Sequence, residues 1–163
     1  MDNLFLSANE RLVLLLKEKG YKISFAESCT GGLCASSVIS VSGSSSVIGS
    51  SFVTYSNESK IKFLNVKKDT IDTYDVVSEE VAREMALGVC RVSGADVGIG
   101  ITGIAGPDGG TPDKPVGTVC FGFNILGNVT TKTVNFGNIG RNEVRLEAAE
   151  FVIKALIELL ESL

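Results

Sequence analysis

Apolar positions along the chain recur with two different periods. In residues 78–94, Val81, Met85 and Val89 recur every four positions, which predicts a helix with one apolar face. Residues 141–161 carry a similar stripe and predict a second long helix. Both segments favour packing of one helical face against a common core.

Other segments alternate between apolar and polar positions, or are apolar throughout, as strands do. We expect five such strands, at residues 22–27, 47–55, 96–102, 119–125 and 129–136. A Gly127-Asn128 turn joins the last two and predicts an antiparallel hairpin.

Shorter helices are expected between the strands, at about residues 3–19, 31–41 and 57–64. The first of these helices should end at Gly20. Its start is left open, because Ser7 and Glu10 fit a capping box and would place the start later than residue 3.

Strands that alternate with helices predict an α/β fold, a three-layer α/β/α sandwich. Its mixed sheet should be mostly parallel and include the C-terminal hairpin. We found no repeat or linker, so residues 1–163 should form a single domain. The segment after residue 64 has no clear period before residue 78, and residues 103–115, with all three prolines, should form one long loop.

Composition narrows the function classes. The formal net charge is −4, so we expect no broad surface for nucleic acid or an anionic membrane. No segment approaches the length of a membrane span, and the N-terminus lacks a signal-peptide pattern, so a cytoplasmic protein is expected. The chain contains no histidine, which excludes a Ser-His-Asp triad, a Cys-His pair and a histidine metal site within it.

The four cysteines form no CxxC pair. We interpret them as reduced and mostly buried residues. They are Cys29, Cys34, Cys90 and Cys120.

The first candidate site is the segment AESCTGG at residues 26–32, where a strand ends and a helix begins. Ligands bind at such strand ends in open α/β sheets, and amides at a helix start can receive negative charge. Ser28 could therefore be a nucleophile beside an oxyanion site. The alternative is that Ser28 or Thr30 only caps the helix.

The second candidate is the segment TYSNESK at residues 54–60. Without histidine, a serine needs another base, and a lysine can serve if burial keeps its amine neutral. Tyr55 and Lys60 could both turn toward one point, with the tyrosine hydroxyl helping to relay a proton. The alternative places Lys60 in a solvated patch with Lys62, Lys67 and Lys68.

The third candidate is the glycine-rich segment at residues 98–110, which contains GxGxxG. A dinucleotide site is excluded because the glycines lie inside a strand and no acidic residue follows at the expected spacing. A ligand-binding loop around Thr102 and Gly103 and a plain turn both remain open.

Arg141 and Arg145 form the fourth candidate, because they lie one turn apart at the start of the last helix. Cations there oppose the helix dipole, and an anionic ligand would compensate them. A solvated pair offset by Glu143 and Glu147 is the alternative.

Taken together, the chain resembles the CinA C-terminal-domain family, the nicotinamide-nucleotide amidases. Three segments in the same order carry the resemblance: AESCTGG at 26–32, FVTYSNESK at 52–60 and GITGIAGPDGGTPDKPVGTV at 100–119. The resemblance extends over nearly the whole chain. Family members often carry a further N-terminal domain, and this chain looks like the stand-alone form.

The resemblance implies hydrolysis of nicotinamide mononucleotide to nicotinic acid mononucleotide and ammonia, with a Ser, Tyr and Lys as catalytic residues. In this sequence they are Ser28, Tyr55 and Lys60. No metal or cofactor is implied. The partner would be a small nucleotide substrate, and a homo-oligomer is left open.

We add to this an inference about substrate contacts. Amides near Thr30 and Gly31, or in the Thr102-Gly103 turn, would stabilise the oxyanion, and Arg141, Arg145 or both would bind the phosphate. A rival hypothesis is a non-catalytic nucleotide-sensing domain that signals to a protein partner. That function would use the same glycine loops without needing a buried Lys60.

Overall fold

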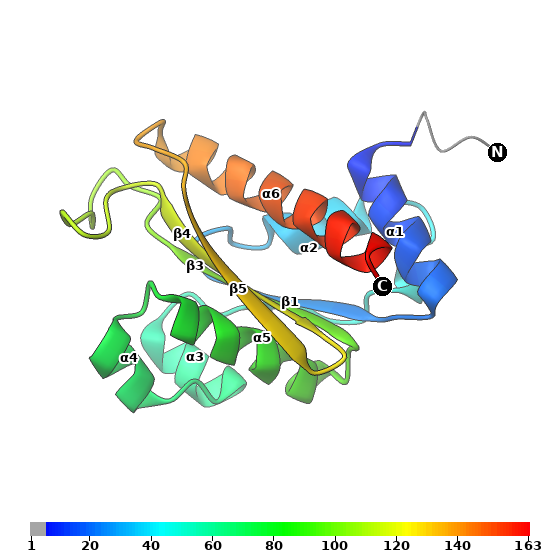
Figure 1. Cartoon of the computed structure of the whole chain (residues 1–163), viewed down its shortest axis with the longest axis horizontal. Coiled ribbons are helices and arrows are strands. Elements are labelled where there is room, and N and C mark those ends of the chain that lie inside the picture. Colours follow the sequence, from blue (N-terminus) through cyan, green and yellow to red (C-terminus); the bar gives the residue numbers. More distant parts are fainter. Residues whose placement is uncertain (1–5) are drawn as a thin grey trace.

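A single five-stranded sheet forms the centre of the computed structural model, which describes residues 6–163 (Figure 1). Its strand order is β2-β1-β3-β4-β5. The strands are β1 (Ile23–Glu27), β2 (Phe52–Val53), β3 (Val97–Gly103), β4 (Thr118–Ile125) and β5 (Asn128–Asn135). Strand β1 pairs in parallel with β2 and β3, whereas β4 pairs antiparallel with both of its neighbours. Four strands thus point one way and β4 the other, which confirms the predicted mixed sheet.

Helices cover both faces of this sheet (Figure 1). One face carries α1 (Ala8–Lys19), α2 (Leu33–Ile39) and α6 (Arg141–Glu161), and the other carries α3 (Asn57–Leu64), α4 (Lys68–Tyr74) and α5 (Glu79–Ser93). The predicted three-layer α/β/α architecture is confirmed. No helix within residues 6–163 is long and apolar enough to cross a membrane.

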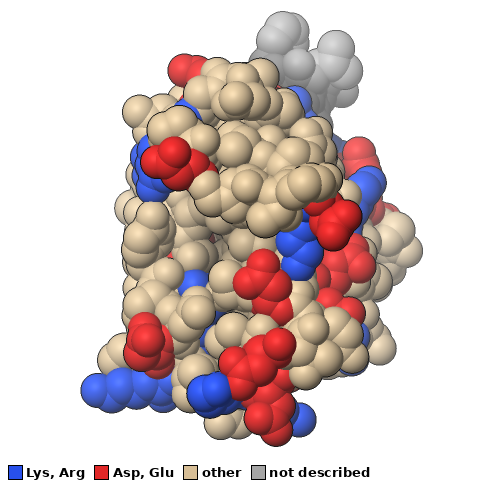
Figure 2. Space-filling model, turned by 90° about the vertical axis from the view of Figure 1, so that its left-hand side faces the viewer, with Lys and Arg blue, Asp and Glu red and all other residues tan. Residues whose placement is uncertain are grey.

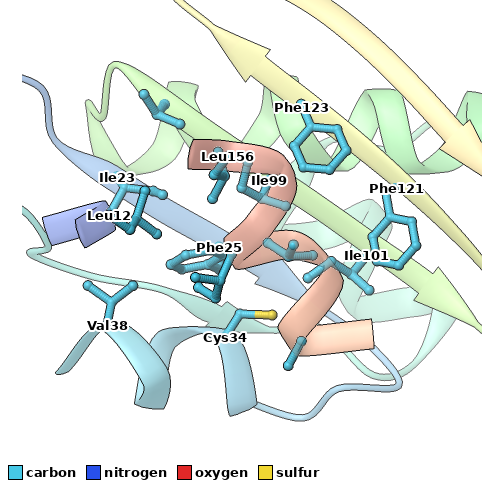
Figure 3. Close-up of a cluster of buried hydrophobic side chains, with 14 of the residues drawn as sticks. Leu12, Ile23, Phe25, Cys34, Val38, Ile99, Ile101, Phe121, Phe123 and Leu156 are labelled. Carbon is cyan, nitrogen blue, oxygen red and sulfur yellow. The ribbon is translucent and has the colours of Figure 1, made fainter. Parts of the chain in front are cut away.

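The larger part of the core lies between the sheet and α1, α2 and α6 (Figure 3). Side chains alternate along each strand, so one face receives the bulky apolar residues. These include Phe25 of β1, Ile99 and Ile101 of β3, and Phe121 of β4, all fully buried. Their burial fixes the register of the three central strands.

The opposite face of β3 and β4 carries glycines, and α5 packs directly on them. A Cβ added at Gly100 or Gly122 would lie 2.2 or 2.3 Å from the carbonyl oxygen of Ala82, and one at Gly98 would lie 2.5 Å from that of Ala86. The GxGxxG pattern therefore reflects close packing between helix and sheet, in agreement with the exclusion of a dinucleotide site.

Strand β2 is much shorter than the predicted strand at residues 47–55. Beside β1, serine hydroxyls replace the backbone hydrogen bonds of a regular strand pair. Ser24 Oγ donates to the Ser50 carbonyl at 2.7 Å, and the Phe25 amide donates to Ser51 Oγ at 3.0 Å. Only Phe52 and Val53 form regular strand pairs, because side-chain bonds satisfy the preceding backbone groups.

Helix α4 was not predicted, and the structure decides between the two starts left open for α1. Helix α4 occupies part of the stretch without a clear period, and its start is capped from α5, where Glu84 accepts from the Lys67 amide at 2.8 Å and from Thr70 Oγ1 at 2.7 Å. A cap from a distant residue leaves no local sequence pattern. Helix α1 begins at Ala8 with Ser7 and Glu10 in a capping box, as the later predicted start requires, while residues 3–5 lie outside the described residues.

Candidate active site

Ser28 follows β1 directly and lies at the carboxyl end of the parallel strands. Its amide donates to the Ile101 carbonyl at 3.0 Å, which extends the β1–β3 pairing by one residue. Alternation along β1 places Phe25 in the core under α6 and Ala26 in the cluster under α5. The Ser28 side chain therefore faces the α3 and α5 side of the sheet, and Ser28 is only 8% exposed.

Lys60 comes from the first turns of α3 and meets Ser28 inside the protein. Its Nζ lies 2.9 Å from Ser28 Oγ, 2.9 Å from the Thr54 carbonyl oxygen and 3.1 Å from the Tyr55 carbonyl oxygen. The residue is 1% exposed, and no carboxylate contacts the amine among the described residues. The solvated-patch alternative for Lys60 is therefore wrong.

Burial lowers the pKa of Lys60 from its ordinary value of 10.5 to about 8. Desolvation disfavours the ammonium form, and nearby Cys29 and Glu58 offset this only in part. An amine with this pKa is partly neutral near physiological pH, so it can accept a proton from the serine it touches.

A cavity of about 250 Å³ opens beside this pair. Its lining combines the ends of β1 and β3 with the segments around α3, α5 and α6: Ser28, Cys29, Tyr55, Asn57, Lys60, Val76, Val77, Thr102, Gly103, Ala105 and Arg141. Thr102 is held in place because its Oγ1 donates to the Val76 carbonyl at 3.0 Å. The structure thus brings together most of the residues that the sequence singled out.

Tyr55 takes a different position from the one expected for a proton relay. Its hydroxyl accepts from Arg141 Nη2 at 2.9 Å and makes no hydrogen bond with Ser28 or Lys60 among the described residues, and the residue is 61% exposed. Arg141 also donates from Nη1 to the Gly106 carbonyl at 2.7 Å. Tyr55 and Arg141 therefore form one wall of the cavity, while the Tyr55 carbonyl contacts Lys60.

The helix-start amides expected to receive negative charge are already occupied. The buried carboxylate of Glu27 accepts from the amides of Gly32, Cys34 and Ala35 at 3.0, 3.2 and 2.9 Å. The Gly31 amide donates to the Ser28 carbonyl at 3.1 Å. Gly31 therefore cannot supply an oxyanion donor in this arrangement, which corrects that part of the prediction.

Two other amides near Ser28, those of Cys29 and Thr30, have no protein acceptor within residues 6–163. Gly103 ends β3, where it pairs with Val119 of β4. Thr30 is fully buried and does not line the cavity, and the group of Thr30 that bears on Ser28 is its backbone amide, which has no protein acceptor among the described residues.

Arg141 and Arg145 have separate roles in the structure. Arg145 does not line the cavity, and its guanidinium donates to the Cys29 carbonyl at 2.9 Å and the Thr30 carbonyl at 3.3 Å. It also donates to Asn142 Oδ1 at 3.0 Å. The pair therefore does not form a shared phosphate site, because only Arg141 lines the cavity.

The cysteines are free thiols, as expected. Burial raises the pKa of Cys29 to about 11 and that of Cys34 well above its ordinary value. Cys29 is next to Ser28, but at neutral pH its thiol stays protonated and is a poor nucleophile.

Glu27, Asn57 and Val76–Val77 also belong to this region, although the sequence did not predict a role for them. Glu27 could have been found as an acidic residue at the end of a strand, just before a glycine-led helix start. No local sequence pattern marks the two valines as cavity residues, because they line the cavity only through the way the segment between α4 and α5 folds.

Figure 2 shows the end of the molecule at which the residue 104–117 loop and the start of α6 lie. Acidic and basic side chains are scattered among uncharged ones over this face. Within residues 6–163, no group of three or more Cys, Asp or Glu side chains is arranged to hold a metal ion.

Fold and site together define an α/β domain with a buried serine–lysine pair at the carboxyl ends of parallel strands. The chain belongs to the CinA C-terminal domain family, whose model matches residues 6–160. It is also similar to crystal structures of a CinA superfamily protein from Klebsiella pneumoniae (33% identity, TM-score 0.91, 97% of this chain and 100% of that one) and of the competence/damage inducible protein CihA from Agrobacterium tumefaciens (39% identity, TM-score 0.89, 97% and 99%).

Among curated relatives, the chain is 48% identical over 158 residues to a CinA-like protein from Kosmotoga olearia, covering 94% of this chain and 38% of that protein. The chain spans about a third of the length of several such relatives. It is also 48% identical over 143 residues to the nicotinamide-nucleotide amidohydrolase PncC from Enterobacter agglomerans, with 87% of each protein covered.

Proposed function

We propose that this chain is a serine amidohydrolase that converts nicotinamide mononucleotide and water to nicotinic acid mononucleotide and ammonia. The observation that carries the proposal is the contact between Ser28 Oγ and the buried Lys60 Nζ at 2.9 Å. The name of the Enterobacter relative supports the same substrate and bond.

The three acceptors around Lys60 explain how it can act as a base. A neutral amine has two N–H donors and one lone pair. The carbonyls of Thr54 and Tyr55 accept the two N–H groups, so the lone pair is left for the Ser28 hydroxyl proton. After proton transfer, the ammonium has three donors and still meets three acceptors, so neither state leaves the buried amine unpaired.

The reaction then proceeds in two stages. Lys60 takes the proton of Ser28 Oγ while the oxygen bonds to the carboxamide carbon, and the carbon–nitrogen bond breaks as the departing nitrogen takes the proton from Lys60. Ammonia leaves. A water molecule then gives a proton to Lys60 as its oxygen bonds to the acyl carbon, and the bond from that carbon to Ser28 Oγ breaks as Lys60 returns the proton to Oγ, which releases the acid. No step requires a metal ion or a cofactor.

The oxyanion that forms in each stage needs donors close to Ser28. The unoccupied amides of Cys29 and Thr30 are the groups suited to this task. We infer that Cys29 and Thr30 act together, since the amide that follows a nucleophile is a common donor.

Arg141 is the cation suited to the substrate phosphate. It lines the cavity, is exposed, and offers a planar guanidinium that matches phosphate oxygens. We expect Arg141→Met to raise KM for the nucleotide about 10-fold or more while hardly changing turnover of the riboside that lacks the phosphate. Equal losses for both substrates would remove Arg141 from this role.

The rival function, a nucleotide-sensing module without catalysis, leaves the buried Ser28–Lys60 contact without a purpose. Burial of a lysine costs free energy, and here the amine is directed at a serine in a cavity. Incubating the pure protein with nicotinamide mononucleotide and measuring ammonia separates the two. Ammonia release with wild-type protein but not with Ser28→Ala supports the amidase. Binding of the nucleotide without release supports the sensor.

A further inference from the structure

The short loop from Ser28 to Gly32 is held from two sides by charged residues that lie outside the cavity. On one side, the Glu27 carboxylate binds the amides of Gly32 and the following helix α2. On the other, Arg145 of α6 binds the carbonyls of Cys29 and Thr30 from Nε and Nη2 at 2.9 and 3.3 Å. Neither charged group lines the cavity itself.

The Arg145 contact determines which way a neighbouring amide points. The peptide between Cys29 and Thr30 is trans, so its carbonyl and its N–H lie on opposite sides of the chain. With the Cys29 carbonyl directed at Arg145, the Thr30 N–H must point away from α6. The peptide between Ser28 and Cys29 is also trans. Its carbonyl, on Ser28, accepts from the Gly31 amide, so the Cys29 N–H points to the opposite side of the chain.

The sequence provides for this contact at three further positions. Asn142 accepts from Arg145 Nη1 at 3.0 Å and fixes the guanidinium plane from the preceding turn of α6. Gly31 has a left-handed backbone with φ of 59°, and a Cβ there would lie 3.1 Å from Arg145 Nη2, so glycine leaves room for the guanidinium. The Glu27 carboxylate then anchors the loop where it enters α2.

We propose that Arg145 is a positioning residue that orients the Thr30 amide as an oxyanion donor for Ser28, beside the Cys29 amide, whose peptide is held by the Gly31–Ser28 hydrogen bond. The proposal rests on the proposed serine mechanism, and it assigns Arg145 a role separate from phosphate binding. Losing Arg145 frees the Cys29–Thr30 peptide to rotate, while Ser28 and Lys60 keep their contact. Transition-state stabilisation falls and ground-state binding of the nucleotide does not.

The test uses Arg145→Met and Arg145→Lys, with Arg83→Met as a matched control. Arg83 lies on α5, is exposed, and approaches one backbone carbonyl, that of Val129 at 3.5 Å, away from the cavity. We expect Arg145→Met to lower kcat by about 10- to 100-fold with KM for the nucleotide changed by less than about 3-fold. Arg145→Lys should recover part of the loss because one amine can serve one of the two carbonyls, and Arg83→Met should match the wild type.

Chemical rescue protects this test against a general loss of structure. Adding methylguanidinium to Arg145→Ala should restore part of kcat in a saturable manner, and should do nothing for Arg83→Met. Rescue requires that the empty guanidinium site persist, so an unfolded variant cannot give it. An Arg145→Met variant that retains wild-type kcat, or one that raises KM only for the phosphorylated substrate, would overturn the positioning role.

A fluorophosphonate probe separates this proposal from the proposed substrate. In this reaction Ser28 Oγ bonds to phosphorus, fluoride leaves, and the serine proton passes to Lys60, while the P=O oxygen occupies the oxyanion site. We expect labelling of wild-type Ser28 to be about 10-fold or more faster than labelling of Arg145→Met, measured by intact-protein mass. If wild type labels in this way yet releases no ammonia, the substrate is wrong and the positioning role stands. Equal labelling rates for both proteins would contradict the positioning role.

Discussion

The parallel half of the sheet, β2-β1-β3, and the β4–β5 hairpin share one core but contribute differently to the cavity. Residues that follow β1 and β2 supply its serine and its lysine, and the end of β3 supplies Thr102 and Gly103, whereas within residues 6–163 no residue of β4 or β5 lines it. Strand β4 is buried along its whole length, and β5 alternates between half-buried and exposed positions.

Strand direction explains this difference. The carboxyl ends of parallel strands lie at one edge of the sheet, and the segments leaving them meet there. Strand β4 runs the other way, so the tight turn of the hairpin lies at the opposite edge. The hairpin therefore contributes packing, and within residues 6–163 it is linked to the cavity through the segments at its two ends, where Ala105 precedes β4 and Arg141 follows β5.

The largest effect is expected at Ser28. Replacing it with alanine removes the nucleophile and should lower ammonia release at least about 10⁴-fold, while the unfolding midpoint stays close to that of the wild type. Cys29→Ala is the comparison, because that thiol is protonated at neutral pH and should matter far less. A severe loss in Cys29→Ala with activity retained in Ser28→Ala would contradict the assignment.

Lys60→Met should have the next largest effect, a fall of about 10²- to 10⁴-fold in kcat from loss of the general base. The neutral amine is the active form, and its pKa lies near 8, so wild-type kcat/KM should rise with pH through about 8 and then level off. Lys60→Met should show no rise in this range. A wild-type profile that is flat from pH 6 to 10 would exclude Lys60 as the base.

The two halves should respond alike where packing rather than chemistry is changed. Gly100→Ala in β3 and Gly122→Ala in β4 would each bring a Cβ within 2.3 Å of the Ala82 carbonyl oxygen, so each should lower the free energy of unfolding by about 1–3 kcal/mol in urea titrations. Gly49→Ala, where a Cβ meets nothing within 4 Å, is the control and should change it by less than about 0.5 kcal/mol. Unequal responses of Gly100 and Gly122 would mean that α5 packs differently on the two halves.

The smallest effect is expected on the exposed face of the hairpin. Lys132 of β5 is exposed and lies 5.6 Å from the ring of Phe151, a weak cation–π contact. Lys132→Ala should change the free energy of unfolding by less than about 1 kcal/mol and leave kcat and KM unchanged. A clear loss of activity would show that the hairpin takes part in the reaction after all.

Much of the fold could be predicted because its signals are local. The stripe of Val81, Met85 and Val89 and the alternation of Phe121 and Phe123 report directly on burial at one face. Helix α4 was missed and β2 was predicted too long because distant partners decide both: Glu84 caps α4, and serine hydroxyls replace backbone pairing beside β1.

The candidate site shows the same division. Its residue types were visible as motifs, and the contact of Ser28 with Lys60 agrees with them. The sequence did not predict which acceptor each donor group would bind, because that depends on which acceptor lies nearest in the folded protein. Arg141 and Arg145 look equivalent in sequence, yet one lines the cavity and the other binds two backbone carbonyls.

Trapping the covalent intermediate tests the central claim most directly. Wild-type protein mixed with nicotinamide mononucleotide is quenched in acid within the first turnovers, digested and analysed by mass spectrometry. The mechanism predicts a mass increase equal to the nucleotide acyl group on Ser28 and none in Ser28→Ala. An acyl group on Cys29, or ammonia release with unmodified Ser28 at every quench time, would contradict the account.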